Sequence, residues 1–249
     1  MSISNLMNRA TLVFGLIFTT VPTAVNAAAI DFDTWNAFGD VTTSLGSASL
    51  SNNALLDDDF PEPDSDFNFS GDPAIDSVTL ESSLGLSPGS LDPDGDNFIQ
   101  ATEGSGLTDS VTFTELTQPI FNWQFLTNDT TFVDSNGFRF ADYGFVFSED
   151  MIEAIVSTDS ILTTSSTNYA RETTGTYKSV FTPGTYNLGM GVVDVDSVDR
   201  SSALVINNAQ TKPVPESNSG FILLAIGLGL AFINPAIKTK ASIIKKIDR

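Results

Sequence analysis

Cysteine and histidine are both absent from the 249 residues of this chain, and basic residues are scarce. Without cysteine the chain forms no disulfide and offers no thiol nucleophile, so its stability must come from an ordinary core. Lysine and arginine number 11 against 31 aspartates and glutamates, which gives a net charge of −20. A field of this sign repels phosphates and attracts cations, so we expect no nucleic-acid partner.

The missing residue types also weigh against catalysis. Histidine and cysteine supply the usual general base, metal ligand and thiol nucleophile, and the sequence has neither a Gly-x-Ser-x-Gly motif nor a phosphate-binding glycine loop. A glycoside hydrolase needs only two carboxylates at a set separation, and among so many acids such pairs arise by chance. We therefore expect no enzyme and no catalytic residues, and the enzymatic alternative is a carboxylate-dependent glycoside hydrolase.

The N-terminus has the parts of a secretory signal peptide. Residues 1–9 carry one cation, residues 10–21 are mostly apolar, and residues 25–27 have the small or permitted side chains that a signal peptidase requires. We predict a signal peptide over residues 1–27, cleaved after its last alanine, with Ala29 as a second choice. A retained N-terminal anchor is the alternative.

The C-terminus combines a short polar motif at residues 213–219, an apolar run at 220–237 and a basic tail at 238–249. As a helix, the apolar run is about 27 Å long, close to the roughly 30 Å of a hydrocarbon core. The lysines that follow it predict a cytoplasmic C-terminus. We predict a transmembrane helix over 220–237, and a core helix of a soluble domain is the alternative.

This C-terminal arrangement resembles the PEP-CTERM sorting signal that exosortase recognises. The resemblance rests on Val214, Pro215 and Glu216, followed by the Gly- and Leu-rich span and the basic tail, with Ser217 where the family has a second proline. It implies export in a Gram-negative bacterium, through an inner-membrane intermediate, to the cell surface or the extracellular matrix. Signal peptidase and exosortase would be the partners during export, and the span would be a transient membrane anchor.

The acidic region 28–212 has the pattern of an all-β domain. Phe121, Trp123 and Phe125 alternate with polar residues, and similar short alternating runs recur with turn residues between them. We predict an antiparallel β-sandwich of jelly-roll type, in which two sheets face one aromatic core. One short helix is expected over 77–86, with Asp76 as its N-cap.

A second resemblance covers residues 80–208. Runs such as Ala101-Thr-Glu-Gly-Ser105, Phe121-Asn-Trp-Gln-Phe-Leu-Thr127 and Gly191-Val-Val-Asp-Val-Asp196 are similar to those of exported cyanobacterial proteins that carry this sorting signal. The resemblance implies no known activity.

Acidic residues with the spacing of a calcium loop follow the predicted helix. Asp92, Asp94 and Asp96 alternate, and Glu103 stands eleven residues after the first, as at positions 1, 3, 5 and 12 of an EF-hand loop. Asn97 replaces the glycine of that motif, so we predict a calcium site of another geometry. An ordinary Asp-Pro-Asp-Gly turn is the alternative. The acidic stretch from residue 57 to 76 is expected to be a solvated loop, or a loop ordered by calcium.

Aromatic residues raise the possibility of a carbohydrate-binding module. Trp35 lies among Asp33, Thr34 and Asn36 and is the better candidate for stacking on a sugar, because Trp123 alternates with phenylalanines and is expected in the core. We predict an exported surface or matrix protein of unknown activity, with calcium as a stabilising ligand. The alternative is a carbohydrate-binding matrix module with exopolysaccharide as its partner.

Overall fold

The computed structural model describes residues 27–53, 67–92, 101–133, 135, 137, 139–195 and 200–215. The predicted signal peptide, except for its last residue, and the transmembrane segment 220–237 lie outside these ranges. None of the helices in the described ranges is long and apolar enough to cross a membrane.

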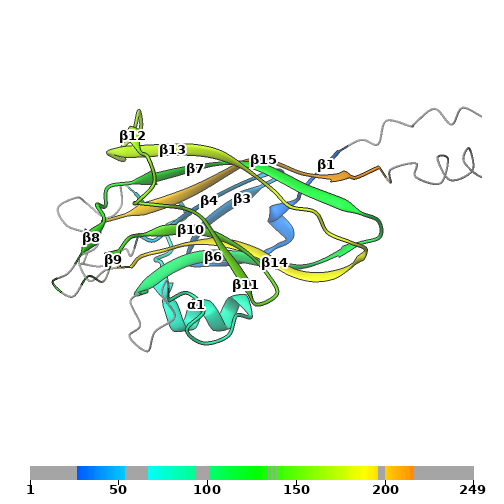
Figure 1. Cartoon of the computed structure of the whole chain (residues 1–249), viewed down its shortest axis with the longest axis horizontal. Helices are drawn as coiled ribbons and strands as arrows, with labels where there is room; N and C mark the ends of the chain where they lie inside the picture. Colours follow the sequence, from blue (N-terminus) through cyan, green and yellow to red (C-terminus); the bar gives the residue numbers. More distant parts are fainter. Residues whose placement is uncertain are drawn as a thin grey trace, which may run out of the picture.

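Two antiparallel sheets make up the domain, as the alternating sequence pattern predicts (Figure 1). The first sheet has the strand order β12 (Thr163–Thr164), β13 (Arg171–Lys178), β7 (Thr117–Thr127), β15 (Ser202–Pro213), β4 (Ser47–Ser51) and β3 (Asp40–Ser44), with β1 (Ala28–Ala29) paired to β15. The second has the order β11 (Met151–Ser157), β10 (Tyr143–Ser148), β14 (Gly184–Val193), β6 (Glu103–Phe113) and β2 (Asn36–Phe38), with β5 (Ile75–Asp76) paired to β6. Strands β8 (Phe132–Val133) and β9 (Arg139–Phe140) form a separate hairpin.

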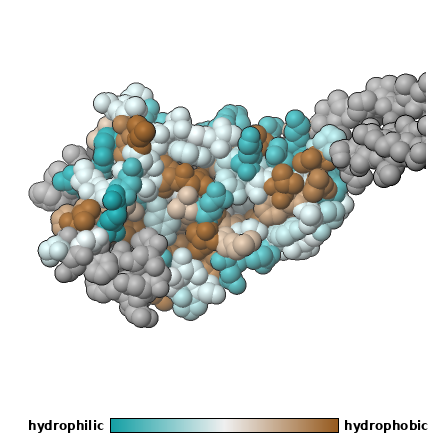
Figure 2. All heavy atoms as spheres, in the orientation of Figure 1, coloured by the Kyte–Doolittle hydropathy of each residue, from teal (hydrophilic) through white to brown (hydrophobic). Residues whose placement is uncertain are grey.

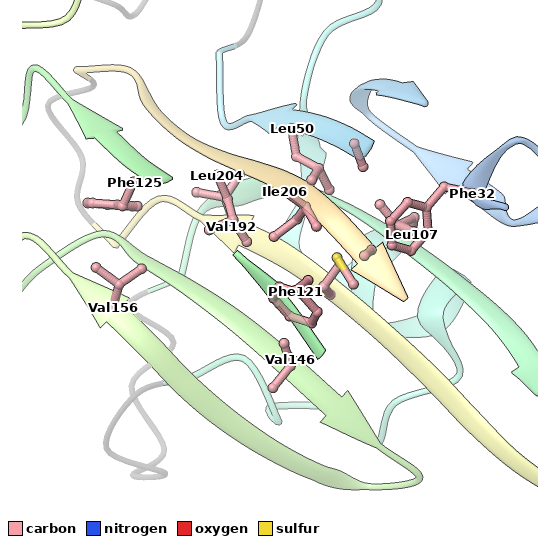
Figure 3. Close-up of a cluster of buried hydrophobic side chains, with 13 residues drawn as sticks. Phe32, Leu50, Leu107, Phe121, Phe125, Val146, Val156, Val192, Leu204 and Ile206 are labelled. Carbon is pink, nitrogen blue, oxygen red and sulfur yellow. The ribbon is translucent and has the colours of Figure 1, made fainter. Parts of the chain in front are cut away.

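The main core lies between the two sheets (Figure 3). Phe121 and Phe125 of β7 are buried there, opposite Val146 and Val192 of the second sheet, and Trp123 between them is half-buried against the same cluster. The predicted aromatic face of β7 is therefore confirmed. Burying these side chains removes apolar surface from water at about 25 cal/mol per Å², which is the main stabilising contribution to such a sandwich.

A second core lies on the outer face of the second sheet, under helix α1 (Ser77–Leu84). Phe145 and Phe147 of β10 pack there with Leu80 and Leu84 of the helix. Their rings lie over glycines of the paired strand β14, since a Cβ on Gly189 would come 2.2 Å from the Phe147 ring. The expectation of one aromatic core is therefore wrong. Period-2 alternation gives a buried face but cannot say which side of the sheet that face covers.

The predicted helix is confirmed with its N-cap, and it ends at Leu84, two residues before the predicted end. The Asp76 carboxylate accepts a hydrogen bond from the backbone N–H of Thr79 at 2.9 Å. Hydrogen bonding with the Thr79 side chain, together with this backbone bond, lowers the pKa of Asp76. Gly85 ends the helix in the left-handed region, with φ of 75°. An N-cap carboxylate and a left-handed glycine satisfy the backbone groups that a short helix leaves unpaired.

Candidate functional site

One end of the sandwich holds an apolar cavity of about 370 Å³ between the two sheets, which we call the end cavity. Figure 2 shows hydrophobic residues gathered near the right-hand end of the molecule, where β1 and the end of β15 lie in Figure 1. The lining is mostly apolar and aromatic. Its members include Trp35, Val111, Phe113, Phe121, Tyr177 and Phe181. Its volume is within the range of small-molecule sites.

Trp35, the predicted stacking residue, lines this cavity. It directly follows the 3-10 helix η1 (Phe32–Thr34), and its ring meets the buried ring of Phe32 edge to face at 5.0 Å. The Trp35 side chain is half-buried against the main core rather than fully exposed. Its indole N–H has no hydrogen-bond acceptor among the described residues and is free to donate to a ligand.

Asp109 brings a carboxylate to the same cavity. It lies on β6 between Leu107 and Val111, and the regular pairing of β6 with β14 puts it on their inward face. The antiparallel register of β2 and β6 pairs Asn36 with Thr108. Continuing this register by one residue places Trp35 opposite Asp109. Within the described ranges the Asp109 carboxylate accepts no hydrogen bond and forms no ion pair. Sequence reasoning missed this residue, because one aspartate among 31 acids gives no signal.

Tyr177 and Phe181 form the side of the cavity nearest the edge of the first sheet. Tyr177 stacks on Phe121 at 5.0 Å, and Phe181 lies 5.3 Å from Phe113. Partial burial raises the pKa of Tyr177, so the phenol stays neutral and can donate a hydrogen bond. A second cavity of about 410 Å³ shares both residues and adds the carboxylate of Glu153.

The opposite end of the sandwich buries carboxylates instead of aromatic rings. Asp40 is fully buried and accepts hydrogen bonds from the backbone N–H groups of Phe69 and Ser70 at 2.9 and 2.7 Å. The hydroxyl groups of Ser51 and Ser70 donate to it as well. Such a set of donors compensates for the water that a buried carboxylate loses.

Asp142 and Asp194 form a buried acid pair at this polar end. Asp142 also accepts hydrogen bonds from the side chains of Asn52 and Ser202 and from the N–H of Val195. Burial raises the pKa of Asp142. A glycosidase pair must reach its substrate, and these two carboxylates are 0% and 2% exposed.

Two of the four predicted calcium residues, Asp92 and Glu103, map to the polar end. Asp92 is nearly buried at the end of a turn, and Glu103 begins β6 opposite Asp76. Asp94 and Asp96 lie outside the described residues. Among the residues that are described, no three His, Cys, Asp or Glu side chains are grouped to hold a metal. The calcium site therefore stays a prediction.

A buried carboxylate orders the chain that enters the predicted calcium loop. Glu81 of α1 accepts hydrogen bonds from the backbone N–H groups of Gly89 and Leu91 at 2.8 and 2.9 Å. The Tyr143 hydroxyl donates to the Leu91 carbonyl at 2.6 Å. Helix α1 and strand β10 thus fix the position of the chain at Asp92.

Half of the predicted sorting motif is described. Val214 donates its N–H to the carbonyl of Leu116 at 2.8 Å, next to the turn between β6 and β7. Pro215 is the last described residue, while Glu216 and Ser217 lie outside the described ranges. The described chain therefore ends beside the end cavity.

The outer face of the first sheet has a shallow hollow of about 610 Å³, lined by uncharged residues that include Trp123 beside amides and hydroxyls. Asn122 and Gln124 of β7 lie there between Thr176 of β13 and Asn207 of β15, and the Thr176 hydroxyl donates to the Asn122 side chain at 3.0 Å. The sequence pattern places these amides opposite the buried aromatics but gives them no role.

No protein-family model and no curated protein matches this sequence. Among solved structures, a β-glucosidase from Kluyveromyces marxianus is similar at 14% identity and a TM-score of 0.26, over 71% of this chain and 17% of that one. The N-terminal cellulose-binding domain of Cellulomonas fimi β-1,4-glucanase C is similar at 13% identity and the same TM-score, over 74% of this chain and 90% of that one. Likeness at this level assigns neither ligand nor activity to this chain.

Proposed function

We propose that this chain is an exported β-sandwich module of jelly-roll type that binds a small ligand in the end cavity. The observation that carries the proposal is that Trp35 and Asp109 line the same cavity. Both line one aromatic cavity, and neither the indole N–H nor the carboxylate has a partner among the described residues. Polar groups that face an apolar cavity without partners are costly unless water or a ligand satisfies them.

We also propose that the module binds without catalysis. The absence of histidine and cysteine from the sequence supports this proposal. The burial of the Asp142–Asp194 pair argues in the same direction, since no substrate reaches it in this conformation.

Tryptophan fluorescence tests the cavity directly. The sequence has two tryptophans, so a Trp123→Phe variant leaves Trp35 as the reporter. We expect a saturable change in its emission with at least one member of a panel of uncharged, anionic and cationic small aromatic solutes. Val111→Phe fills the cavity and should abolish the change, while Val205→Phe on the outer face should not. Failure of every solute to saturate the signal contradicts the proposal.

We propose further that signal peptidase and exosortase process the chain, which then resides at the cell surface or in the matrix. The support is the sequence of residues 1–27 and 213–249. Intact mass should be measured on protein recovered from membrane, surface and medium of the native host. We expect a surface or medium species that begins near Ala28 and ends near Ser217. A membrane species that still ends at Arg249 would make the tail a permanent anchor.

A second candidate function is binding of neutral exopolysaccharide. The specific observation is the uncharged row of amides and hydroxyls around Asn122, Thr176 and Asn207 on the outer face of the first sheet. Such side chains match sugar hydroxyls without repelling or attracting charge. Retention on immobilised glucan that is lost in Asn122→Ala/Thr176→Ala, and kept in Trp35→Ala, would place the sugar on this face. Loss in Trp35→Ala alone would place it at the stacking residue of the end cavity.

A further inference from the structure

We propose that the ligand of the end cavity is an organic ammonium ion whose substituents are apolar. This inference rests on the proposed function of the cavity and specifies the class of its ligand. The inference is carried by the negative charge of the unpartnered Asp109 carboxylate, which lies beside the aromatic rings of the cavity.

Every charged side chain that lines the end cavity and the adjoining second cavity is acidic. Asp31 and Asp109 line the first and Glu153 the second, and the described lining of both contains no lysine or arginine. The Asp31 carboxylate accepts one hydrogen bond, from the N–H of Asp33 at 3.3 Å, whereas Asp109 accepts none. The site therefore has negative charge that no group of the described chain neutralises.

Aromatic faces complement a cation of low hydration. The rings of Trp35, Phe121 and Tyr177 line the same space as Asp109. A cation held against such faces is attracted by the ring quadrupole, and the attraction increases when water is excluded. The chain's net charge of −20 raises the local concentration of cations of any kind.

The apolar lining of the end cavity favours an alkylated ammonium ion over calcium and over sugars. Calcium takes six to eight oxygen ligands, whereas the described lining of the end cavity supplies two carboxylates, those of Asp31 and Asp109. A sugar would need a hydrogen-bond partner for most of its hydroxyls, while rings and aliphatic side chains dominate the lining. An ammonium group with methyl or larger substituents needs only charge and apolar contact, which are what Asp109 and the rings offer.

Choline and its uncharged isostere 3,3-dimethylbutan-1-ol separate charge from shape. Both should be titrated against the full chain with the Trp123→Phe background, and Trp35 emission followed. We expect choline to bind about tenfold more tightly than the isostere. Added salt should reduce this difference, because Asp109 is partly exposed to solvent and salt screens its attraction for the cation.

Asp109→Asn is the decisive variant. It keeps the shape of the side chain and should remove the preference for choline, while Asp109→Glu should retain most of it. The matched control is Asp33→Asn, which makes the same change of charge next to the cavity but on a residue outside its lining, bound to Thr43 at 2.8 Å. Thermal unfolding of each variant checks that the fold is intact.

Three results would overturn the inference, and they differ in what they leave standing. If the isostere binds as well as choline, the cavity takes a neutral ligand. If Asp109→Asn keeps the preference, the Asp109 carboxylate does not select the cation. Either result overturns the inference and leaves the proposed cavity function standing. If neither compound nor any solute of the aromatic panel binds, the cavity function fails with it.

Discussion

The two ends of the sandwich treat acidic side chains in opposite ways. At the polar end the carboxylates of Asp40 and Asp142 are fully buried and surrounded by donors. At the end cavity Asp109 faces aromatic rings and has no partner among the described residues. A buried charge without a cation is tolerated when hydrogen bonds replace its water, so the first arrangement is structural. The Asp109 carboxylate at the end cavity lacks such donors and therefore still needs a partner.

Connection length explains why the ends differ. At the cavity end the strands are joined by short connections at 45–46, 114–116 and 149–150, which leave the space between the sheets uncovered. At the polar end the connections at 52–74 and 194–201 are longer. Their backbone N–H groups reach the buried carboxylates, as at Ser70 and Val195.

The largest expected effect is the removal of the Asp40 carboxylate. Asp40→Ala leaves the N–H groups of Phe69 and Ser70 and the Ser51 hydroxyl without their acceptor. We expect the free energy of unfolding to fall by about 3 kcal/mol or more, since each buried donor left unpaired costs about 1–3 kcal/mol. Urea unfolding followed by circular dichroism measures the loss.

The control for Asp40→Ala is Asp72→Ala, an exposed aspartate in the connection that supplies the donors Phe69 and Ser70. It should change the free energy of unfolding by no more than about 0.5 kcal/mol. Equal effects of the two substitutions would mean that burial of Asp40 contributes nothing and that the contrast between the ends is not energetic.

How far the sequence predicts this contrast depends on the kind of signal. Alternation at Phe121 to Phe125 and the cap at Asp76 are local patterns, and both predictions were confirmed. The burial of Asp40 was not predicted, because its donors at Phe69 and Ser70 come from 29 and 30 residues away. Trp35 was singled out by its polar neighbours, but its companion Asp109 follows only from the pairing of β2 with β6.

A second prediction concerns calcium at the polar end. If Asp92, Asp94, Asp96 and Glu103 hold calcium in the folded state, calcium at about 100 times its Kd stabilises the chain by about 2.7 kcal/mol. Asp94→Ala should then lower the melting temperature in calcium and leave it unchanged in chelator. An equal loss in both conditions would identify Asp94 as an ordinary turn residue. Calcium should not affect binding in the end cavity, so choline titrations in chelator should match those in calcium.

The smallest expected effect is a change in the pH dependence of stability through Asp142. Burial raises the folded-state pKa of this carboxyl, so the folded chain holds its proton more tightly than the unfolded chain. Its contribution is therefore complete below the unfolded pKa of about 3.9 and is lost as the pH rises through the folded-state value.

Asp142→Asn removes this titration while keeping the side-chain shape. Between pH 4.5 and 8, measured in chelator, the wild-type chain should lose more stability with rising pH than the variant. Asp72→Asn makes the same change of charge on an exposed residue and should keep the wild-type slope. The slope and not the absolute stability is the test, because the amide must also fit the donors Ser202 and Val195.

A variant slope equal to that of wild type would show that the Asp142–Asp194 pair is already ionised in the fold. The polar end would then need a bound cation to balance it, as we propose for the cavity end.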